Sequence, residues 1–201
     1  MFRIPAFTAG LFVMLAFSAG VQGFFLIFAV WIQTGMGYSP LAAGLTALAF
    51  SAGSFLLASA AVPLAQRYGR WVLCCGGLLL AAGTGAIQIG AGHVGPGTDP
   101  WPVVPGLVLA GAGLSLLVIP LANVVLAAVP SQAAGGLFST AQQLGGALGV
   151  AVIGTIFFGQ LGTHSFTQAF THGLPVAAGL FLASAALSLL LPKTAVADEH
   201  G

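Results

Sequence analysis

The sequence predicts an all-α integral membrane protein in which six transmembrane helices form one bundle. Of the 201 residues, 58% are hydrophobic and only 3% are charged, whereas soluble domains carry about 25% charged residues. Six apolar segments of about 20 residues, the length that crosses a bilayer, follow one another along the chain. Every lysine and arginine lies outside these segments. We therefore expect a lipid bilayer to surround most of the bundle.

The first three spans are separated by a turn segment and a basic segment. Residues 7–33 are apolar over too long a stretch for a signal peptide, and no polar mature domain follows them. Residues 41–63 follow the turn segment TGMGYSP, and residues 71–91 follow the basic segment QRYGR. Cys74 and Cys75 in the third span have no metal-ligand spacing, and we interpret them as two small apolar residues.

The last three spans follow connectors of different character. Residues 103–127 follow the Gly- and Pro-rich segment GHVGPGTDPWP, and residues 134–158 follow the short link VPSQ. Residues 172–191 follow the polar segment QLGTHSFTQAF. The spans form a six-helix transmembrane bundle over residues 1–192, and we expect residues 193–201 to be a cytoplasmic tail.

The basic residues indicate how the bundle is oriented. Lys and Arg are enriched in cytoplasmic loops. With six crossings, all four basic residues fall on one side of the membrane, and they are Arg3, Arg67, Arg70 and Lys193. We therefore expect a multi-pass protein of the cell (plasma) membrane with both termini in the cytoplasm. Trp31 and Trp101 then lie near the outer interface and Trp71 near the inner one, as expected of aromatic belts.

Two adjacent amides in the fifth span are candidate functional groups. On a helix, Gln142, Gly146 and Gly149 share one face, with Gly145 beside them. The pair Gly145 and Gly149 allows two helix backbones to approach closely, so we predict a helix-packing role for both. An amide in contact with lipid leaves its donors and acceptors unpaired. Gln142 and Gln143 therefore face protein, where they join helices, or a watery cavity, where they contact a substrate.

The first and fourth spans also contain polar candidates. Gln22 and Phe25 lie on one face of the first span, and Gln22 is deep in the membrane. Gln22 is either a cavity residue or a group that hydrogen-bonds between helices. In the fourth span, Pro120 removes one backbone donor and should kink the helix. Asn123 follows within one turn and either satisfies the freed carbonyl groups or lines the cavity.

The residue types also exclude several kinds of protein. No Asp, Glu, Lys or Arg lies inside a predicted span, and none of the 4 histidines is deep. A proton-driven carrier normally needs a titratable group within the membrane, so we expect its coupling groups elsewhere. The chain has no nucleotide-binding loop, metal-ligand cluster or catalytic constellation, so we expect neither an enzyme nor a cofactor. A net charge of +1 gives no footprint for nucleic acid.

Three segments resemble the major facilitator superfamily of transporters. YSPLAAG is similar to the element that opens the second helix of the superfamily's C-terminal half. PLAQRYGR resembles a degenerate form of its inner-loop signature, in which Ala65, Arg67, Gly69 and Arg70 match and Gln66 replaces an aspartate. VPSQAAGGLFSTAQQLGGALGVAVIGT is similar to the helix near the end of the fourteen-spanning drug:proton antiporters.

The resemblance implies the C-terminal six-helix half of a multidrug or small-molecule efflux transporter that works by alternating access and proton antiport. The segment MFRIPAFTAG looks like an internal start, so the implied partner is a missing N-terminal half or a second copy. The implied substrate is a small hydrophobic or cationic compound. In the family the first, second, fourth and fifth helices of each half line the cavity. The implied cavity residues are Gln22, Phe25, Asn123, Gln142 and Gln143.

Two alternatives to a half-transporter with a separate partner stay open. One is a half-transporter that pairs with itself, since two parallel bundles would rebuild a cavity between them. The other is a membrane module that does not transport, either a degenerate remnant or an assembly partner. The absence of charge inside the spans is compatible with the second alternative.

Overall fold

The computed structural model describes residues 3–127 and 131–191, with side chains described over 8–123 and 135–191. In these parts, six helices are long and apolar enough to cross a membrane, which confirms the predicted all-α membrane fold. A π-helical turn, η1 (Trp31–Gly35), extends the first helix, and a 3-10 turn, η2 (Trp101–Val103), precedes the fourth. The six helices are α1 (Arg3–Val30), α2 (Pro40–Tyr68), α3 (Arg70–Ala91), α4 (Val104–Ala127), α5 (Ser131–Gln160) and α6 (Phe166–Ser188).

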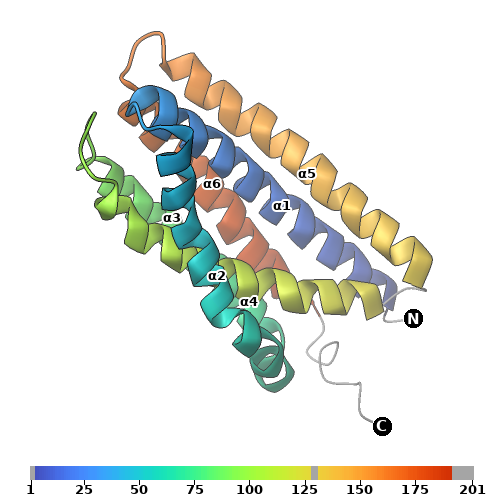
Figure 1. Ribbon diagram of the computed structural model, residues 1–201. Helices are drawn as coiled ribbons and strands as arrows, with labels where there is room; N and C mark the ends of the chain where they lie inside the picture. Colours follow the sequence, from blue (N-terminus) through green and yellow to red (C-terminus); the bar gives the residue numbers. More distant parts are fainter. Residues whose placement is uncertain (1–2, 128–130, 192–201) are drawn as a thin grey trace.

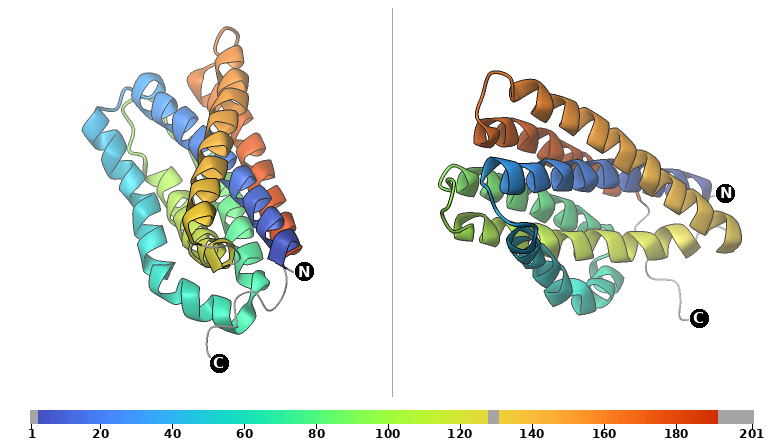
Figure 2. Two further views of the ribbon diagram at one scale, coloured as in Figure 1. Left: turned by 90° about the vertical axis from the view of Figure 1, so that its right-hand side faces the viewer. Right: turned by 45° about the horizontal axis from the view of Figure 1, so that its top comes forward.

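The helices alternate in direction and pack as two groups. Helix α1 packs against α5 and α6, whereas α4 packs against α2 and α3, and the α3–α6 contact joins the groups (Figure 1). The start of α1, the turn between α2 and α3 and the end of α6 lie at the same end of the bundle (Figures 1 and 2). The side chain of Arg3, Lys193 and the predicted tail over 193–201 lie outside the described residues.

Local capping explains why two helices extend beyond the predicted spans. Helix α2 runs through Pro63 to Tyr68 and ends where Gly69 takes a positive φ of 57°. Helix α6 begins at Phe166, earlier than the predicted span of 172–191. It does so because Ser165 and Gln168 form a capping box that satisfies backbone donors of the first turn.

Trp31 lies in the core of the bundle and not on its lipid-facing surface, whereas its depth near the outer interface stays a prediction. Its side chain is fully buried, and its ring stacks on Phe170 with centroids 4.5 Å apart and an interplanar angle of 6°. Its indole N–H donates a hydrogen bond of 3.2 Å to Thr167 Oγ1. In contrast, Trp101 and Trp71 are 72% and 57% exposed. Position along a helix predicts depth, but it does not say which side faces the core.

We expect Trp31→Phe to destabilise the bundle by about 1 kcal/mol, because the phenyl ring keeps much of the stacking and loses the hydrogen bond to Thr167. Thermal unfolding of the purified protein in detergent measures this effect. Trp101→Phe is the control and should leave the midpoint unchanged because Trp101 is largely exposed. Equal shifts in the two variants would contradict a core role for Trp31.

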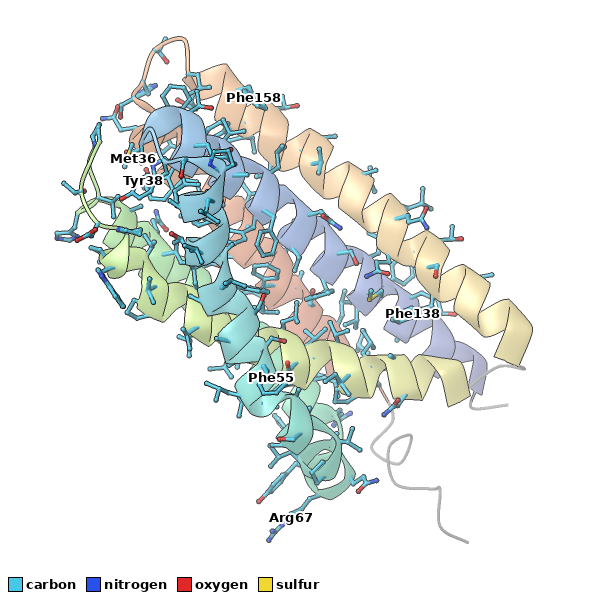
Figure 3. The ribbon with its side chains drawn as sticks, viewed as in Figure 1. Met36, Tyr38, Phe55, Arg67, Phe138 and Phe158 are labelled. Carbon is cyan, nitrogen blue, oxygen red and sulfur yellow. The ribbon has the colours of Figure 1, made fainter. Side chains whose placement is uncertain are left out.

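A tyrosine forms a hydrogen bond between two connectors at the end of the bundle opposite Arg67. The Tyr38 hydroxyl donates to the carbonyl oxygen of Thr98, which joins the connector after η1 to the connector before η2. Figure 3 shows Tyr38 at this end and Arg67 at the other. Burial, and then the nearby Asp99 carboxylate, raise the pKa of Tyr38 above its usual range. The phenol therefore stays protonated and remains a donor at neutral pH.

Candidate substrate-binding pocket

Helices α1 and α5 cross at a seam of small residues. A Cβ atom added at Gly145 would collide with the backbone of Leu15, and one added at Gly149 would collide with the backbone of Ala19. From the α1 side, a Cβ atom added at Gly23 would lie 2.8 Å from the carbonyl oxygen of Gly149. Such close backbone contact is possible only where side chains are absent or very small. The seam includes both glycines for which the sequence predicts close packing.

A pocket of about 540 Å³ opens beside this seam. Its volume falls within the range of about 300–1,000 Å³ that is typical of small-molecule sites. One lining residue comes from α1 and the others come from one face of α5, where they recur at helical spacing. The lining residues are Gln22, Gln142, Gln143, Gly146, Ala147 and Val150. Helical spacing from Gln143 identifies Ala147 and Val150, which are not among the sequence candidates.

Gly146 leaves space for the side chain of Gln22, the α1 residue that lines this pocket. A Cβ atom added at Gly146 would lie 2.9 Å from Cγ of Gln22, closer than real side chains approach each other. The stem of Gln22 therefore lies directly over the bare backbone of Gly146. This contact holds the Gln22 side chain beside the two α5 amides.

The three amides of the pocket are exposed. Gln22 lies near the middle of the apolar span Thr8–Gly35, and Gln142 and Gln143 lie inside the apolar span Gly135–Gln160. None of the three side chains hydrogen-bonds to another described residue. An amide that faces hydrocarbon without a partner is costly. The arrangement is therefore suited to hydrogen bonding with water, a ligand or a second protein surface.

Two of the five sequence candidates do not line this pocket. Phe25 is half-buried and packs edge-on against Phe50 of α2, with ring centroids 5.1 Å apart. It therefore connects α1 to α2 and lies away from the α5 amides. Asn123 is exposed near the end of α4, and its side chain makes no hydrogen bond to the described residues. The interpretation that Asn123 satisfies carbonyl groups freed by Pro120 is not supported.

Known proteins match nearly the whole length of this chain. It is 37% identical over 171 residues to a probable actinorhodin transporter of Streptomyces coelicolor, an alignment that covers 82% of this chain. It is 31% identical over 204 residues to the puromycin resistance protein pur8 of Streptomyces alboniger, covering 90% of this chain. The chain is a homologue of bacterial drug and antibiotic efflux transporters of the major facilitator type. No protein-family model matches it.

This transporter homologue spans only about a third of the length of the curated relatives that it matches. The alignments cover 29% of the probable actinorhodin transporter and 40% of the puromycin resistance protein. A tetracenomycin C resistance and export protein of Streptomyces glaucescens is 31% identical, and the alignment covers 81% of this chain and 30% of that relative. The described six helices therefore correspond to one part of a longer transporter architecture.

The inner-loop motif of the transporter homologue forms a tight turn and a helix-end contact. The Gly69 N–H donates to the carbonyl oxygen of Ala65 at 2.7 Å and ends α2. Arg70 is the first residue of α3, and its Nη1 donates to the carbonyl oxygens of Leu189 and Leu191 at 2.7 and 3.3 Å. These carbonyls lie just beyond the end of α6, where the backbone has no further helical donors. Arg70 therefore fastens α3 to α6.

The other arginine of the motif has no such contact. Arg67 is exposed, and its guanidinium carbon lies 5.5 Å from the centroid of the Tyr68 ring. Figure 3 shows Arg67 extending from the end of the bundle. The two basic residues thus have different environments although the sequence motif treats them alike.

Proposed function

We propose that this six-helix bundle is one half of a transmembrane efflux transporter and that the pocket between α1 and α5 forms part of its substrate cavity. The observation that supports this most directly is a group of three exposed amides in an otherwise apolar wall, none of which hydrogen-bonds to another residue that the structure describes. Relatives that are named as exporters and drug-resistance proteins support the same function. Transport then proceeds by alternating access, in which two bundles rock around a site at their interface.

The proposed partner is a second six-helix bundle, on the same polypeptide or on another one. The aligned region makes up 29–40% of the relatives' length, which leaves ample chain for another bundle. Large apolar side chains on the α2 and α5 surfaces are strongly exposed, including Phe55 at 82% and Leu144 at 56%. A second bundle opposite α1 and α5 would enclose the amide pocket and shield these amides from lipid.

Proton exchange is the proposed energy source, and the protonatable groups then belong to the second bundle. Between residues 8 and 191, the formally charged side chains are Arg67, Arg70 and Asp99, and all three lie in or beside connectors. Arg67 lies in the last turn of α2 and Arg70 is the first residue of α3. The turn that joins these two helices lies at the end of the bundle where α1 begins and α6 ends (Figure 1). This supports the proposed location in the cell membrane with both termini in the cytoplasm.

We expect the double variant Gln142→Leu/Gln143→Leu to lower efflux of a lipophilic fluorescent dye by about tenfold. Each neutral hydrogen bond contributes about 0.5–1.5 kcal/mol, and a tenfold change, which is about 1.4 kcal/mol, lies within the range for two lost bonds. The assay measures dye retention in cells that express the chain alone or together with the part of the Streptomyces coelicolor relative that the alignment does not cover. Export by the chain alone would indicate that two copies pair.

Gln33→Leu is the matched control for this assay, because Gln33 is an exposed glutamine in η1 that does not line the pocket. It should leave dye efflux unchanged. Dye retention that is the same with and without the chain, in both expression arms, would contradict the efflux function. Unchanged efflux in the double leucine variant would remove these amides from the substrate cavity.

A further inference from the structure

Two histidines lie in contact at the end of the bundle opposite the turn between α2 and α3. His164 lies in the connector from α5 to α6, the loop at the top of Figure 1, and His172 lies in the second turn of α6. Their rings meet edge to face, with centroids 5.6 Å apart, and both side chains are exposed. We propose that His164 and His172 together bind one divalent transition-metal ion such as Zn²⁺. This inference goes beyond the efflux function and does not depend on it.

The distance between the two rings suits a shared metal ion. Zinc bonds to an imidazole nitrogen at about 2.0–2.1 Å, which places the centroids of two rings on one ion about 5–6 Å apart. The observed 5.6 Å lies inside this range, although the rings are nearly perpendicular, at 84°. Rotation of the two side chains, without movement of the backbone, therefore brings one nitrogen of each ring to the ion.

The backbone around both histidines is held by hydrogen bonds. The carbonyl oxygen of Gln160 accepts from the backbone N–H of His164 at 2.9 Å. On the other side of His164, Ser165 and Gln168 form the capping box with which α6 begins, with hydrogen bonds of 3.1 and 3.3 Å. His172 lies on the helix that this box starts. Because a metal site is more precise when its ligands stand on a fixed backbone, these contacts favour binding.

A hydrogen bond sets the protonation of the His164 ring. The Thr163 hydroxyl donates to the carbonyl oxygen of Gln160 at 3.4 Å, and its oxygen then accepts from Nδ1–H of His164 at 2.8 Å. In this arrangement Nε2 of His164 keeps its lone pair for a metal ion. Metal-ligating histidines commonly donate their second ring N–H in this way. The His172 side chain makes no hydrogen bond to another described residue, so both of its ring nitrogens are available.

The ligand types select a particular class of metal. Neutral imidazole suits Zn²⁺, Ni²⁺ and Cu²⁺, whereas Mg²⁺ and Ca²⁺ prefer oxygen ligands. Among the residues that the structure describes, no group of three or more His, Cys, Asp or Glu side chains could hold a metal ion. The pair therefore supplies two ligands and water completes the coordination, so we expect an affinity in the micromolar range.

Calorimetric titration of Zn²⁺ into the 201-residue chain tests this inference, with protein that carries no histidine tag. Asp198, Glu199 and His200 follow one another in the sequence and could bind zinc by themselves, so every variant carries His200→Ala. Into this background we introduce either His164→Ala or His172→Ala. Elution as a single species in detergent establishes that each variant is folded.

His93→Ala in the same background is the matched control. His93 is also exposed in a connector, and its Nδ1 lies 3.0 Å from the carbonyl oxygen of Ile89, but it has no histidine ring beside it among the described residues. We expect one Zn²⁺ per chain in the background protein and in His93→Ala. Either His164→Ala or His172→Ala should weaken binding by at least about tenfold. No zinc binding by the background protein, or undiminished binding in both test variants, would overturn the inference.

Electron paramagnetic resonance of bound Cu²⁺ tests direct ligation. Cu²⁺ binds nitrogen ligands more tightly than Zn²⁺ does, so it should occupy the same pair. We expect coupling to the nitrogens of two imidazoles in the background protein and in His93→Ala, and to one imidazole at most after His164→Ala or His172→Ala. A copper spectrum that neither of these two substitutions changes would show that the ion lies elsewhere on the chain and would contradict the proposed site.

Discussion

Gly149→Leu is expected to prevent the bundle from folding or to destabilise it by about 3 kcal/mol or more. A Cβ atom at this position would meet the oxygen, carbonyl carbon and Cα of Ala19, which are rigid backbone atoms of α1. A flexible side chain can move aside, but a helix backbone can yield only if α1 and α5 separate along their length. The seam would open, and the amide pocket beside it would lose its shape. Thermal unfolding and size-exclusion profiles in detergent measure the effect.

Gly159→Leu on the same helix is the matched control. A Cβ atom added at Gly159 meets nothing within 4 Å, and the residue is exposed. This variant should behave like wild type in both measurements. A stable, monodisperse Gly149→Leu protein with a wild-type unfolding midpoint would show that the close α1–α5 contact is not required for the fold.

Arg70→Ala should lower the stability of the bundle by about 2–3 kcal/mol, because hydrogen bonds to a charged group are stronger than neutral ones. The Arg70 guanidinium donates to the carbonyl oxygens of Leu189 and Leu191 at 2.7 and 3.3 Å. These carbonyl groups carry the partial negative charge of the end of α6, so the cation stabilises them further. Without it, both acceptors lose their partner and α6 should detach locally from α3. Amide hydrogen exchange at residues 186–191 should therefore rise in the variant.

A variant of the neighbouring arginine distinguishes the loss of this hydrogen-bonded contact from the loss of a positive charge in general. Arg67→Ala removes the same charge from the same turn, but the Arg67 side chain is exposed and stacks on Tyr68. We expect less than about 0.5 kcal/mol of change for such a surface substitution. Arg70→Lys should recover part of the stability, since an ammonium group can reach one carbonyl oxygen but lacks the planar fork of guanidinium. Equal effects of Arg67→Ala and Arg70→Ala would contradict the proposed contact.

Much of the architecture was predictable from local sequence because the membrane imposes simple rules. A segment must be apolar and about 20 residues long to cross the bilayer as a helix. This rule located six helices, although capping at Ser165 moved the start of α6 to Phe166. Helical periodicity also placed Gln142, Gly146 and Gly149 on one face of α5. In the structure, Gly149 packs against α1 and the other two line the adjacent pocket.

The errors concern the side of a helix that meets another helix. Trp31 was predicted at the depth of the outer interface, on the surface of the bundle, yet it faces inward and stacks on Phe170. Phe25 follows Gln22 by three residues, but it packs against Phe50 of α2 and not beside the amides. The role of Arg70 was also missed, because its acceptors lie more than 100 residues away in the chain and belong to ordinary leucine backbone groups. Such acceptors leave no signal in the sequence.

The sequence by itself determined that this protein is a multi-pass membrane bundle, because the length and apolar character of each helix depend only on its own residues. It also predicts, without a test so far, that several amides avoid lipid. Tertiary structure alone decided that Gln22, Gln142 and Gln143 line one pocket and that Arg70 hydrogen-bonds to the backbone just beyond α6. These outcomes depend on how far one helix is rotated and shifted against another. That rotation follows from many small packing contacts, such as the close approach of Gly149 to Ala19, and not from any one segment.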